Sequence, residues 1–114
     1  MRKRILRRVA VGAALALCVS VWLQAAGSSP VADAAMKNDA AAVKALLKDG
    51  ADVNAAQGDG MTALHWASRK GNTEVAQMLL YAGANVKATT RLGAYTPLMM
   101  AAEQGHADVI AALL

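Results

Sequence analysis

Two histidines carry most of the catalytic potential of this sequence. His65 and His106 are its only histidines, and histidine is the side chain that shuttles protons most readily near neutral pH. Ser68 lies three residues after His65, a spacing that could bring a hydroxyl next to a base on one face of a helix. No nearby carboxylate stands ready to orient the imidazole, and a catalytic triad needs all three groups. We therefore predict structural roles: His65 should hydrogen-bond around the turn at Thr62, and His106 should stabilise a turn between two helices.

The other patterns that could support chemistry are weaker. Structural and catalytic metal sites usually combine Cys and His at close spacing, whereas Cys18 is the sole cysteine and the carboxylates are dispersed. The run Gly58-Asp59-Gly60 lacks the lysine and the strand-to-helix context of a phosphate loop, and is typical of a turn. The sequence therefore predicts a protein that is not an enzyme and that holds no metal or cofactor.

Charge is distributed unevenly along the chain. The sequence has a net charge of +4 and a pI near 9.6, which could suggest a nucleic-acid partner. Five of the twelve basic residues lie in the first eight positions, however, and all eight acidic residues come later. Residues 28–114 thus carry seven basic and eight acidic groups, a net charge of −1. We expect no nucleic-acid partner.

The basic N-terminus belongs to a predicted secretory signal peptide that covers residues 1–27. A charged n-region (1–8) precedes an uncharged apolar h-region (9–23) of fifteen residues and a tail of small residues. A membrane-spanning helix needs about 20 apolar residues, which favours a cleaved signal. We expect cleavage within about three residues of Ser28. The mature chain would then be a bacterial protein, periplasmic or secreted, without membrane contact.

Two alternatives for this leader stay open. An uncleaved signal anchor would hold the chain on the inner membrane. A lipoprotein would be acylated at Cys18, because Leu15-Ala16-Leu17-Cys18 resembles a lipobox, although Leu17 stands where such boxes have a small residue. Cleavage near Ser28 would remove the only thiol, so the mature fold would depend on packing without a disulfide.

The rest of the sequence repeats with a period of 33 or 34 residues. Three groups of motifs share this period: Leu46-Leu47, Leu79-Leu80 and Leu113-Leu114; Gly50-Ala51-Asp52-Val53 and Gly83-Ala84-Asn85-Val86; Thr62-Ala63-Leu64 and Thr96-Pro97-Leu98. Independent motifs with one period indicate stacked structural repeats, each of which buries its apolar face against its neighbours.

These repeats resemble the ankyrin-repeat family, whose unit is a β-turn followed by two antiparallel helices. Thr62-Ala63-Leu64-His65 and Thr96-Pro97-Leu98-Met99 are similar to the family's Thr-Pro-Leu-His helix start, and Ser29-Pro30-Val31-Ala32 has the same phase. Ser or Thr at such an N-cap accepts a hydrogen bond from a free backbone N–H, and Pro suits the first helical position.

The resemblance implies an all-α ankyrin-repeat solenoid of about three helix-turn-helix units joined by β-turn fingers, preceded by the signal helix. The units are expected at residues 29–54, 55–87 and 88–114, and the fingers at residues 52–60 and 85–94. Residues able to adopt positive φ should separate the two helices of each unit: Asn38, Gly71 and Gly105. Gly50 and Gly83 should end the second helices of the first two units.

A few positions depart from the pattern or need a role. Lys87 stands where the first finger has Asn54, and the second finger is one residue longer, with the insertion placed at Ala94. Trp66 is expected to be semi-buried, and the adjacent residues Met99 and Met100 are expected in the core.

With no catalytic or metal site predicted, we expect the function to depend on surface residues that contact a partner. In proteins that this chain resembles, partners contact the finger tips and the exposed positions of the first helices along the concave face. The corresponding residues here are Lys37, Gly58, Asp59, Met61, Arg69, Lys70, Arg91, Leu92, Tyr95, Glu103 and Gln104. Tyr and Arg are frequent hot-spot types, which favours Arg69, Arg91 and Tyr95. The resemblance implies a monomeric, non-catalytic protein-protein interaction module or scaffold whose partner is another protein.

The sequence ends in the middle of its pattern. The third unit stops at Leu113-Leu114, without the Gly-Ala run that follows each earlier Leu-Leu pair, and solenoids normally finish with a polar capping repeat. We therefore expect a truncated third unit in a longer chain. The alternative function follows from this expectation: the repeats would be the targeting arm of a longer exported enzyme whose catalytic domain lies beyond residue 114.

Overall fold

The computed structural model describes residues 29–114, so the predicted signal helix and Cys18 lie outside the described residues. The described residues form six helices and no strand. The helices are α2 (Pro30–Met36), α3 (Ala40–Lys48), α4 (Ala63–Lys70), α5 (Thr73–Tyr81), α6 (Pro97–Gln104) and α7 (Ala107–Leu113). They make three helix-turn-helix pairs: unit one (α2, α3), unit two (α4, α5) and unit three (α6, α7). The predicted all-α repeat solenoid is confirmed.

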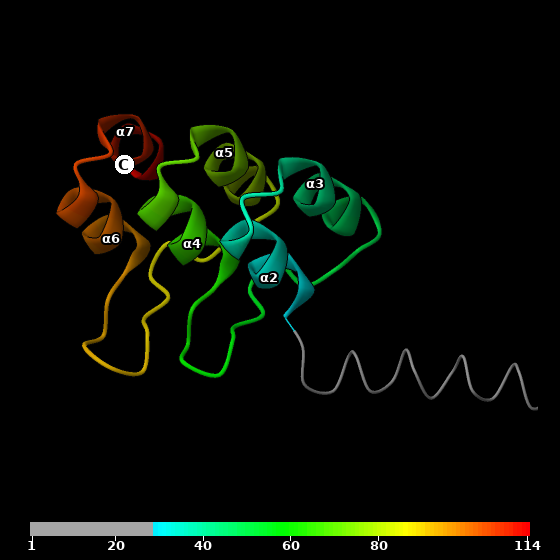
Figure 1. Ribbon diagram of the computed structural model, residues 1–114, viewed down its shortest axis with the longest axis horizontal. Coiled ribbons are helices and arrows are strands. Elements are labelled where there is room, and N and C mark those ends of the chain that lie inside the picture. The colour runs from blue at the N-terminus through cyan, green and yellow to red at the C-terminus, as the bar shows by residue number, and fades with distance from the viewer. Residues whose placement is uncertain (1–28) are drawn as a thin grey trace, which may run out of the picture.

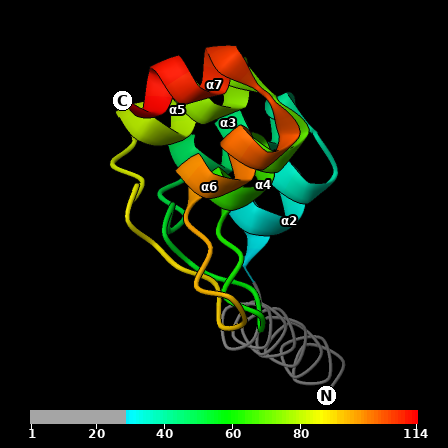
Figure 2. The same ribbon diagram turned by 90° about the vertical axis from the view of Figure 1, so that its left-hand side faces the viewer.

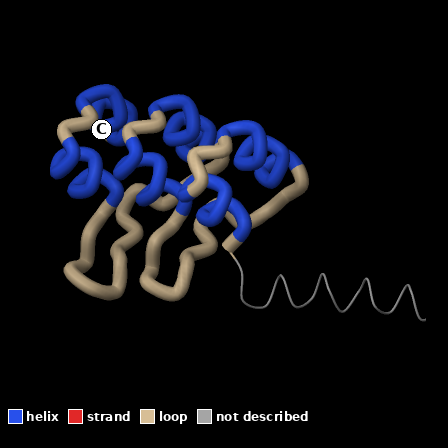
Figure 3. The backbone as a smooth tube through the Cα atoms, viewed as in Figure 1, coloured by secondary structure: helices blue, strands red, loops and turns tan. Residues whose placement is uncertain are grey.

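The three units stack side by side in two layers of helices. In Figure 1 the second helices α3, α5 and α7 form the upper layer, and the first helices α2, α4 and α6 lie below them. Two long loops, the first finger (residues 52–60) and the second finger (residues 85–94), join successive units and project beyond the first helices (Figure 3). Figure 2 shows both fingers on the same side of the helix layers.

Polar side chains cap four of the six described helices at their N-termini: α3, α4, α5 and α6. Thr62 Oγ1 accepts a hydrogen bond from the backbone N–H of His65 at 3.3 Å, and Thr96 Oγ1 accepts one from the N–H of Met99 at 3.2 Å. Asp39 and Asn72 cap α3 and α5 in the same way. Such caps stabilise helices of eight or nine residues, which are too short to form alone.

Ser29 does not cap α2, so this part of the expectation is wrong. Its hydroxyl donates a hydrogen bond to the carbonyl of Ala56 at 2.7 Å, and no cap bond forms. The backbone explains the difference, because Ser29 has ψ 75° whereas Thr62 has the extended ψ of 170°. Ser29 therefore ties the start of unit one to the first finger.

Left-handed residues separate the two helices of every unit, as expected. Asn38, Gly71 and Gly105 have φ values of 60°, 69° and 72°. Gly50 and Gly83, with φ values of 84° and 91°, end the second helices of the first two units. The residues that the sequence singled out as breaks thus adopt the backbone conformation that the repeat needs.

Small side chains let the units approach closely. Ala35, Ala67 and Ala101 on the three first helices are at most 2% exposed and belong to one apolar cluster that runs through all three units. Trp66 packs against this cluster as a partly buried residue, as expected.

The expectation that Met99 belongs to the core is wrong, because its side chain is 52% exposed. Its neighbour Met100 is partly buried. Unit two packs between two neighbouring units, whereas unit three contacts unit two alone among the described units (Figure 1). The side of α6 that carries Met99 is therefore open in the described part of the chain.

Candidate functional site

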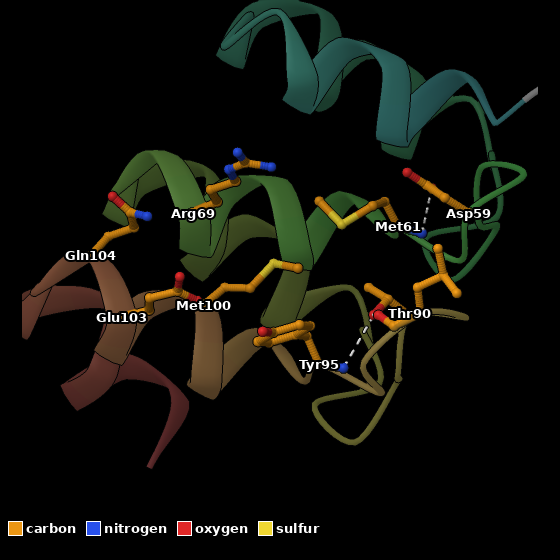
Figure 4. Close-up of a pocket in the computed structure, with 9 residues that line it drawn as sticks. Asp59, Met61, Arg69, Thr90, Tyr95, Met100, Glu103 and Gln104 are labelled. Carbon is orange, nitrogen blue, oxygen red and sulfur yellow. Dashed lines mark hydrogen bonds between the residues drawn. The ribbon is translucent and has the colours of Figure 1, made fainter.

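An open groove lies between α4, α6 and the two fingers (Figure 4). Its volume is about 360 Å³. Its lining consists of Asp59, Met61, Arg69, Thr90, Leu92, Tyr95, Met100, Glu103 and Gln104, which we call the concave groove. Seven of the eleven residues predicted to contact a partner are in this lining: Asp59, Met61, Arg69, Leu92, Tyr95, Glu103 and Gln104.

The floor of the concave groove is apolar. Figure 4 shows the side chains of Met61 and Met100 pointing toward each other, with the ring of Tyr95 beside them. Met61 is buried at 4% exposure, Met100 is partly buried and Tyr95 is 42% exposed. Thioether side chains adapt their shape to a bound surface, and a half-exposed tyrosine offers both a ring and a hydroxyl. This floor can therefore receive an apolar side chain of a partner.

Charged and polar side chains surround this floor. Arg69 lies in the last turn of α4, and Glu103 and Gln104 lie in the last turn of α6, all of them exposed. Asp59 stands on the first finger, where its Oδ1 accepts a hydrogen bond from the Met61 N–H at 3.0 Å. Charges of both signs around an apolar centre are the usual composition of a protein-protein contact surface.

Backbone hydrogen bonds within and between the two fingers fix the finger side of the concave groove. In the first finger the N–H of Gln57 donates to the carbonyl of Met61 at 2.9 Å. In the second finger the N–H of Thr90 donates to the carbonyl of Tyr95 at 3.1 Å. The N–H of Arg91 donates to the carbonyl of Asp59 at 3.0 Å and joins the two fingers to each other. The groove is thus built jointly by units two and three.

The extra residue of the second finger has a structural signature. Gly93 and Ala94 follow one another with φ values of 82° and 50°, so the chain makes two consecutive left-handed steps. The Tyr95 N–H donates to Thr90 Oγ1 at 3.1 Å and closes this longer loop. Ala94, where the insertion was placed, is a residue with a Cβ in the left-handed region. This strained turn directs Tyr95 into the groove.

A polar relay links units one and two along the same face. The indole N–H of Trp66 donates to Gln57 Oε1 at 2.8 Å, and Gln57 Nε2 donates to Asp33 Oδ1 at 2.7 Å. The guanidinium of Arg69 and the ammonium of Lys70 lie 5.7 and 6.0 Å from the centre of the Trp66 ring, within the range of cation–π attraction. Arg69 is therefore held between Trp66 and the concave groove.

His65 is buried next to the concave groove and bonds to the backbone of the groove residue Tyr95. Its predicted bond to the Thr62 turn is confirmed. The backbone N–H of Thr62 donates to Nδ1 at 3.1 Å, which makes Nδ1 an acceptor. Nε2 therefore carries the proton and donates to the carbonyl of Tyr95 at 2.8 Å. Burial lowers the pKa of His65 below 6.5, against smaller opposing effects of the Tyr95 and Ala88 carbonyls and the Asp59 charge. The neutral imidazole thus holds the start of α4 and the backbone at Tyr95 together.

His65 and Ser68 do not form a catalytic pair. Both are fully buried, and Ser68 Oγ has no hydrogen-bond partner, so His65 does not act as its base. His106 contacts the turn between α4 and α5 of the neighbouring unit: its Nε2 lies 3.0 Å from the carbonyl of Arg69, and its ring lies beside Gly71. The ring of His106 thereby fastens unit three to the end of α4.

The remaining predicted residues lie outside the concave groove. Lys37 is exposed at the C-terminal end of α2, Lys70 lies over Trp66, and Gly58 and Arg91 are exposed on the two fingers. They stay predictions as partner contacts.

Sequence reasoning missed two lining residues, Thr90 and Met100. Met100 was expected in the core, and its partly buried side chain instead forms part of the groove floor. Thr90 offered no signal in the sequence, since its place depends on the longer second finger.

Residues 29–114 contain no group of three or more His, Cys, Asp or Glu side chains arranged to hold a metal ion. None of the helices in this range has the length and apolar character to cross a membrane.

Stacked helix pairs, small interhelical residues and projecting loops define the class of helical-repeat solenoids. The sequence matches the family model described as ankyrin repeats, with three copies, over residues 12–90 and 31–114. The chain therefore belongs to the ankyrin-repeat family. The first match begins inside the predicted signal peptide, whose boundary at residue 27 stays a prediction.

Curated relatives are much longer proteins. The chain is 40% identical over 89 residues to the potassium channel AKT3 of Oryza sativa subsp. japonica, covering 76% of this chain and 10% of the channel. It is 42% identical over 87 residues to the E3 ubiquitin-protein ligase XBAT33 of Arabidopsis thaliana, covering 76% and 17%. It is 36% identical over 72 residues to the glycerophosphocholine phosphodiesterase gde1 of Schizosaccharomyces pombe, covering 63% and 6%. The chain thus spans less than a fifth of the length of these relatives.

Proposed function

We propose that this chain is a non-catalytic protein-protein interaction module or scaffold that acts in the bacterial periplasm and recognises its partner through the concave groove and the finger tips. The observation that carries the proposal is the composition of the groove. An apolar floor around Met61, Met100 and Tyr95 is open to solvent, and the exposed charges of Arg69 and Glu103 flank it. This arrangement provides anchors for burial together with polar groups that set specificity.

Three residues should contribute most of the binding energy. Tyr95 lies half-exposed beside the methionines, and Arg69 lies over the Trp66 ring. Arg91 lies on the second finger, where its backbone N–H donates to the carbonyl of Asp59. An aromatic side chain on a rigid support loses little conformational entropy when it binds, and a guanidinium adds bidentate hydrogen bonds to carboxylates. The expected partner is a folded protein.

Affinity capture from a periplasmic extract, with the mature chain as bait, tests this proposal. Arg69→Ala, Arg91→Ala and Tyr95→Ala should each reduce capture of the same partner by about tenfold or more. Lys87→Ala is the matched control, because Lys87 is exposed on the second finger but is neither in the groove lining nor among the residues predicted to contact the partner. Undiminished capture by all three variants would remove the concave groove from the proposal.

Export is tested separately by the mass of the N-terminal peptide of the purified protein. A mature chain should begin within about three residues of Ser28. A mass that begins at Met1 would contradict cleavage and favour the signal anchor, and an acylated Cys18 would favour the lipoprotein.

A second candidate function is that of a targeting arm in a longer exported enzyme. The observation in its favour is that the relatives include a ubiquitin ligase and a phosphodiesterase of which this chain matches 17% and 6%. The sequence beyond residue 114 decides between the two candidates. Further repeats with a polar cap support the scaffold, and a segment with clustered His, Cys or Asp residues supports the enzyme.

A further inference from the structure

A second groove lies on the layer of second helices, between α3 and α5. Its volume is about 520 Å³. Lys44, Leu47 and Lys48 form the α3 wall, and Glu74, Met78 and Tyr81 form most of the α5 wall. We call it the outer groove. It shares no lining residue with the concave groove, so it is a separate surface of the same stack.

The outer groove exposes apolar surface that the fold does not use. Leu47 and Met78 are partly buried and pack against the core. Tyr81, at the end of α5, is 97% exposed, so its ring contributes almost nothing to the packing of the described residues. An exposed tyrosine beside an adaptable methionine is a common composition of interaction surfaces.

The charges along the outer groove have a helical spacing. Lys44 and Lys48 are four residues apart on α3, so their side chains stand one turn apart on the same rim, and both are exposed. Glu74 lies on the opposite rim, one turn before Met78 on α5. Two lysines against one glutamate make the groove net positive, with the positive charge confined to the α3 rim.

We propose that the outer groove binds an acidic amphipathic helix of a partner protein. The apolar stripe of this helix lies over Leu47, Met78 and Tyr81. Carboxylates spaced one turn apart along one edge of the helix pair with Lys44 and Lys48. A helix fits because its own i, i+4 spacing repeats the spacing of the two lysines and of Glu74 and Met78. The module would then bind two partners, one on each face.

The test uses two synthetic peptides of about four helical turns. Both carry the same leucine stripe, one with glutamates at i, i+4 along one edge and the other with lysines at those positions. Fluorescence anisotropy against the full chain should show the acidic peptide binding at least about tenfold more tightly than the basic one. Tyr81→Ala should weaken the acidic peptide by about tenfold. The double variant Lys44→Glu with Lys48→Glu should reverse the preference between the peptides.

Matched controls separate this proposal from the proposed function. Tyr95→Ala and Arg69→Ala, in the concave groove, should leave peptide affinity unchanged. Because Tyr81, Lys44 and Lys48 are exposed, their variants should keep the wild-type circular dichroism. Equal binding of the two peptides, or affinity that is insensitive to the Tyr81 and lysine variants, would overturn the proposal.

Two further measurements address other occupants of the outer groove. Vesicles of phosphatidylcholine with phosphatidylserine that bind the chain through Lys44 and Lys48 more tightly than the acidic peptide does would assign the surface to a membrane. A dimer in analytical ultracentrifugation that Tyr81→Ala dissolves would assign it to a second copy of this chain. Either result would overturn the helix proposal.

Discussion

Units two and three present the same helix start to very different surroundings. Leu64 in unit two is 1% exposed, whereas its counterpart Leu98 in unit three is 36% exposed. His65 is fully buried, whereas Met99 at the same position of the motif is 52% exposed. Unit two packs between two neighbours and unit three contacts unit two alone among the described units. In a solenoid, burial depends on the neighbouring units as much as on the sequence of the unit itself.

The largest difference is expected when the two leucines are truncated. Leu64→Ala removes a fully packed side chain from between two units and should lower the free energy of unfolding by about 3 to 4 kcal/mol. Leu98→Ala removes a side chain that already meets solvent and should cost about 1 kcal/mol. Urea unfolding followed by circular dichroism measures both. Equal losses of unfolding free energy in the two variants would contradict the claim that unit two is packed more tightly than unit three.

The glycines of the two fingers give the next largest difference. Both Gly60 and Gly93 have positive φ, which a Cβ makes unfavourable. A Cβ at Gly60 would also lie 3.0 Å from the backbone nitrogen of Arg91, where the fingers meet, whereas at Gly93 it would meet only the movable ring of Tyr95. Gly60→Ala should therefore cost about 2 to 3 kcal/mol and Gly93→Ala about 1 kcal/mol. Gly58→Ala, with open space around its Cβ, should be nearly neutral.

The pH dependence of stability should distinguish the buried histidine from an exposed one. The pKa of His65 is lowered in the folded state, so the unfolded chain binds a proton first as the pH falls through about 6.5. Stability should fall below that pH by up to about 1.4 kcal/mol per unit and level off below the folded-state pKa.

Two variants isolate this effect of His65. His65→Met should remove this part of the slope between about pH 7.5 and 5.5. Met99→His, which places a histidine on the open face of unit three, should add no slope. A wild-type slope that survives in His65→Met would assign it to another group.

The smallest difference concerns a buried hydroxyl. Ser68 Oγ is fully buried without a hydrogen-bond partner, whereas Ala102 holds the equivalent position in unit three and is exposed. Ser68→Ala should stabilise the chain by about 1 kcal/mol, since it removes an unsatisfied polar group. Ala102→Ser should change stability by less than about 0.5 kcal/mol. Thermal unfolding measures both, and a destabilised Ser68→Ala would show that the hydroxyl has a partner.

Local features of the fold were predictable from the sequence, because they depend on residue type and period. The caps at Thr62 and Thr96 and the left-handed turns at Gly71 and Gly105 follow from the chemistry of single residues. The repeat period added the pairing of helices, although Ser29 shows that one residue type can satisfy the motif and bond elsewhere.

The groove was only partly predictable, because it lies between units. The exposure of Met99 depends on what packs against α6, and Thr90 enters the lining through the shape of a finger that is one residue longer than the first. The bond from His106 to Arg69 crosses between units as well. A sequence pattern specifies each unit, whereas contacts between units depend on their relative placement.

The single backbone bond from Arg91 to Asp59, together with the link from His65 to Tyr95, places the concave groove across the seam between units two and three. Neither unit holds the complete groove, so detachment of unit three would abolish the site. A ligand that needs both units therefore selects the stacked state and stabilises the seam by RT ln(1 + [L]/Kd). Binding of the partner and packing of unit three against unit two are therefore one linked equilibrium.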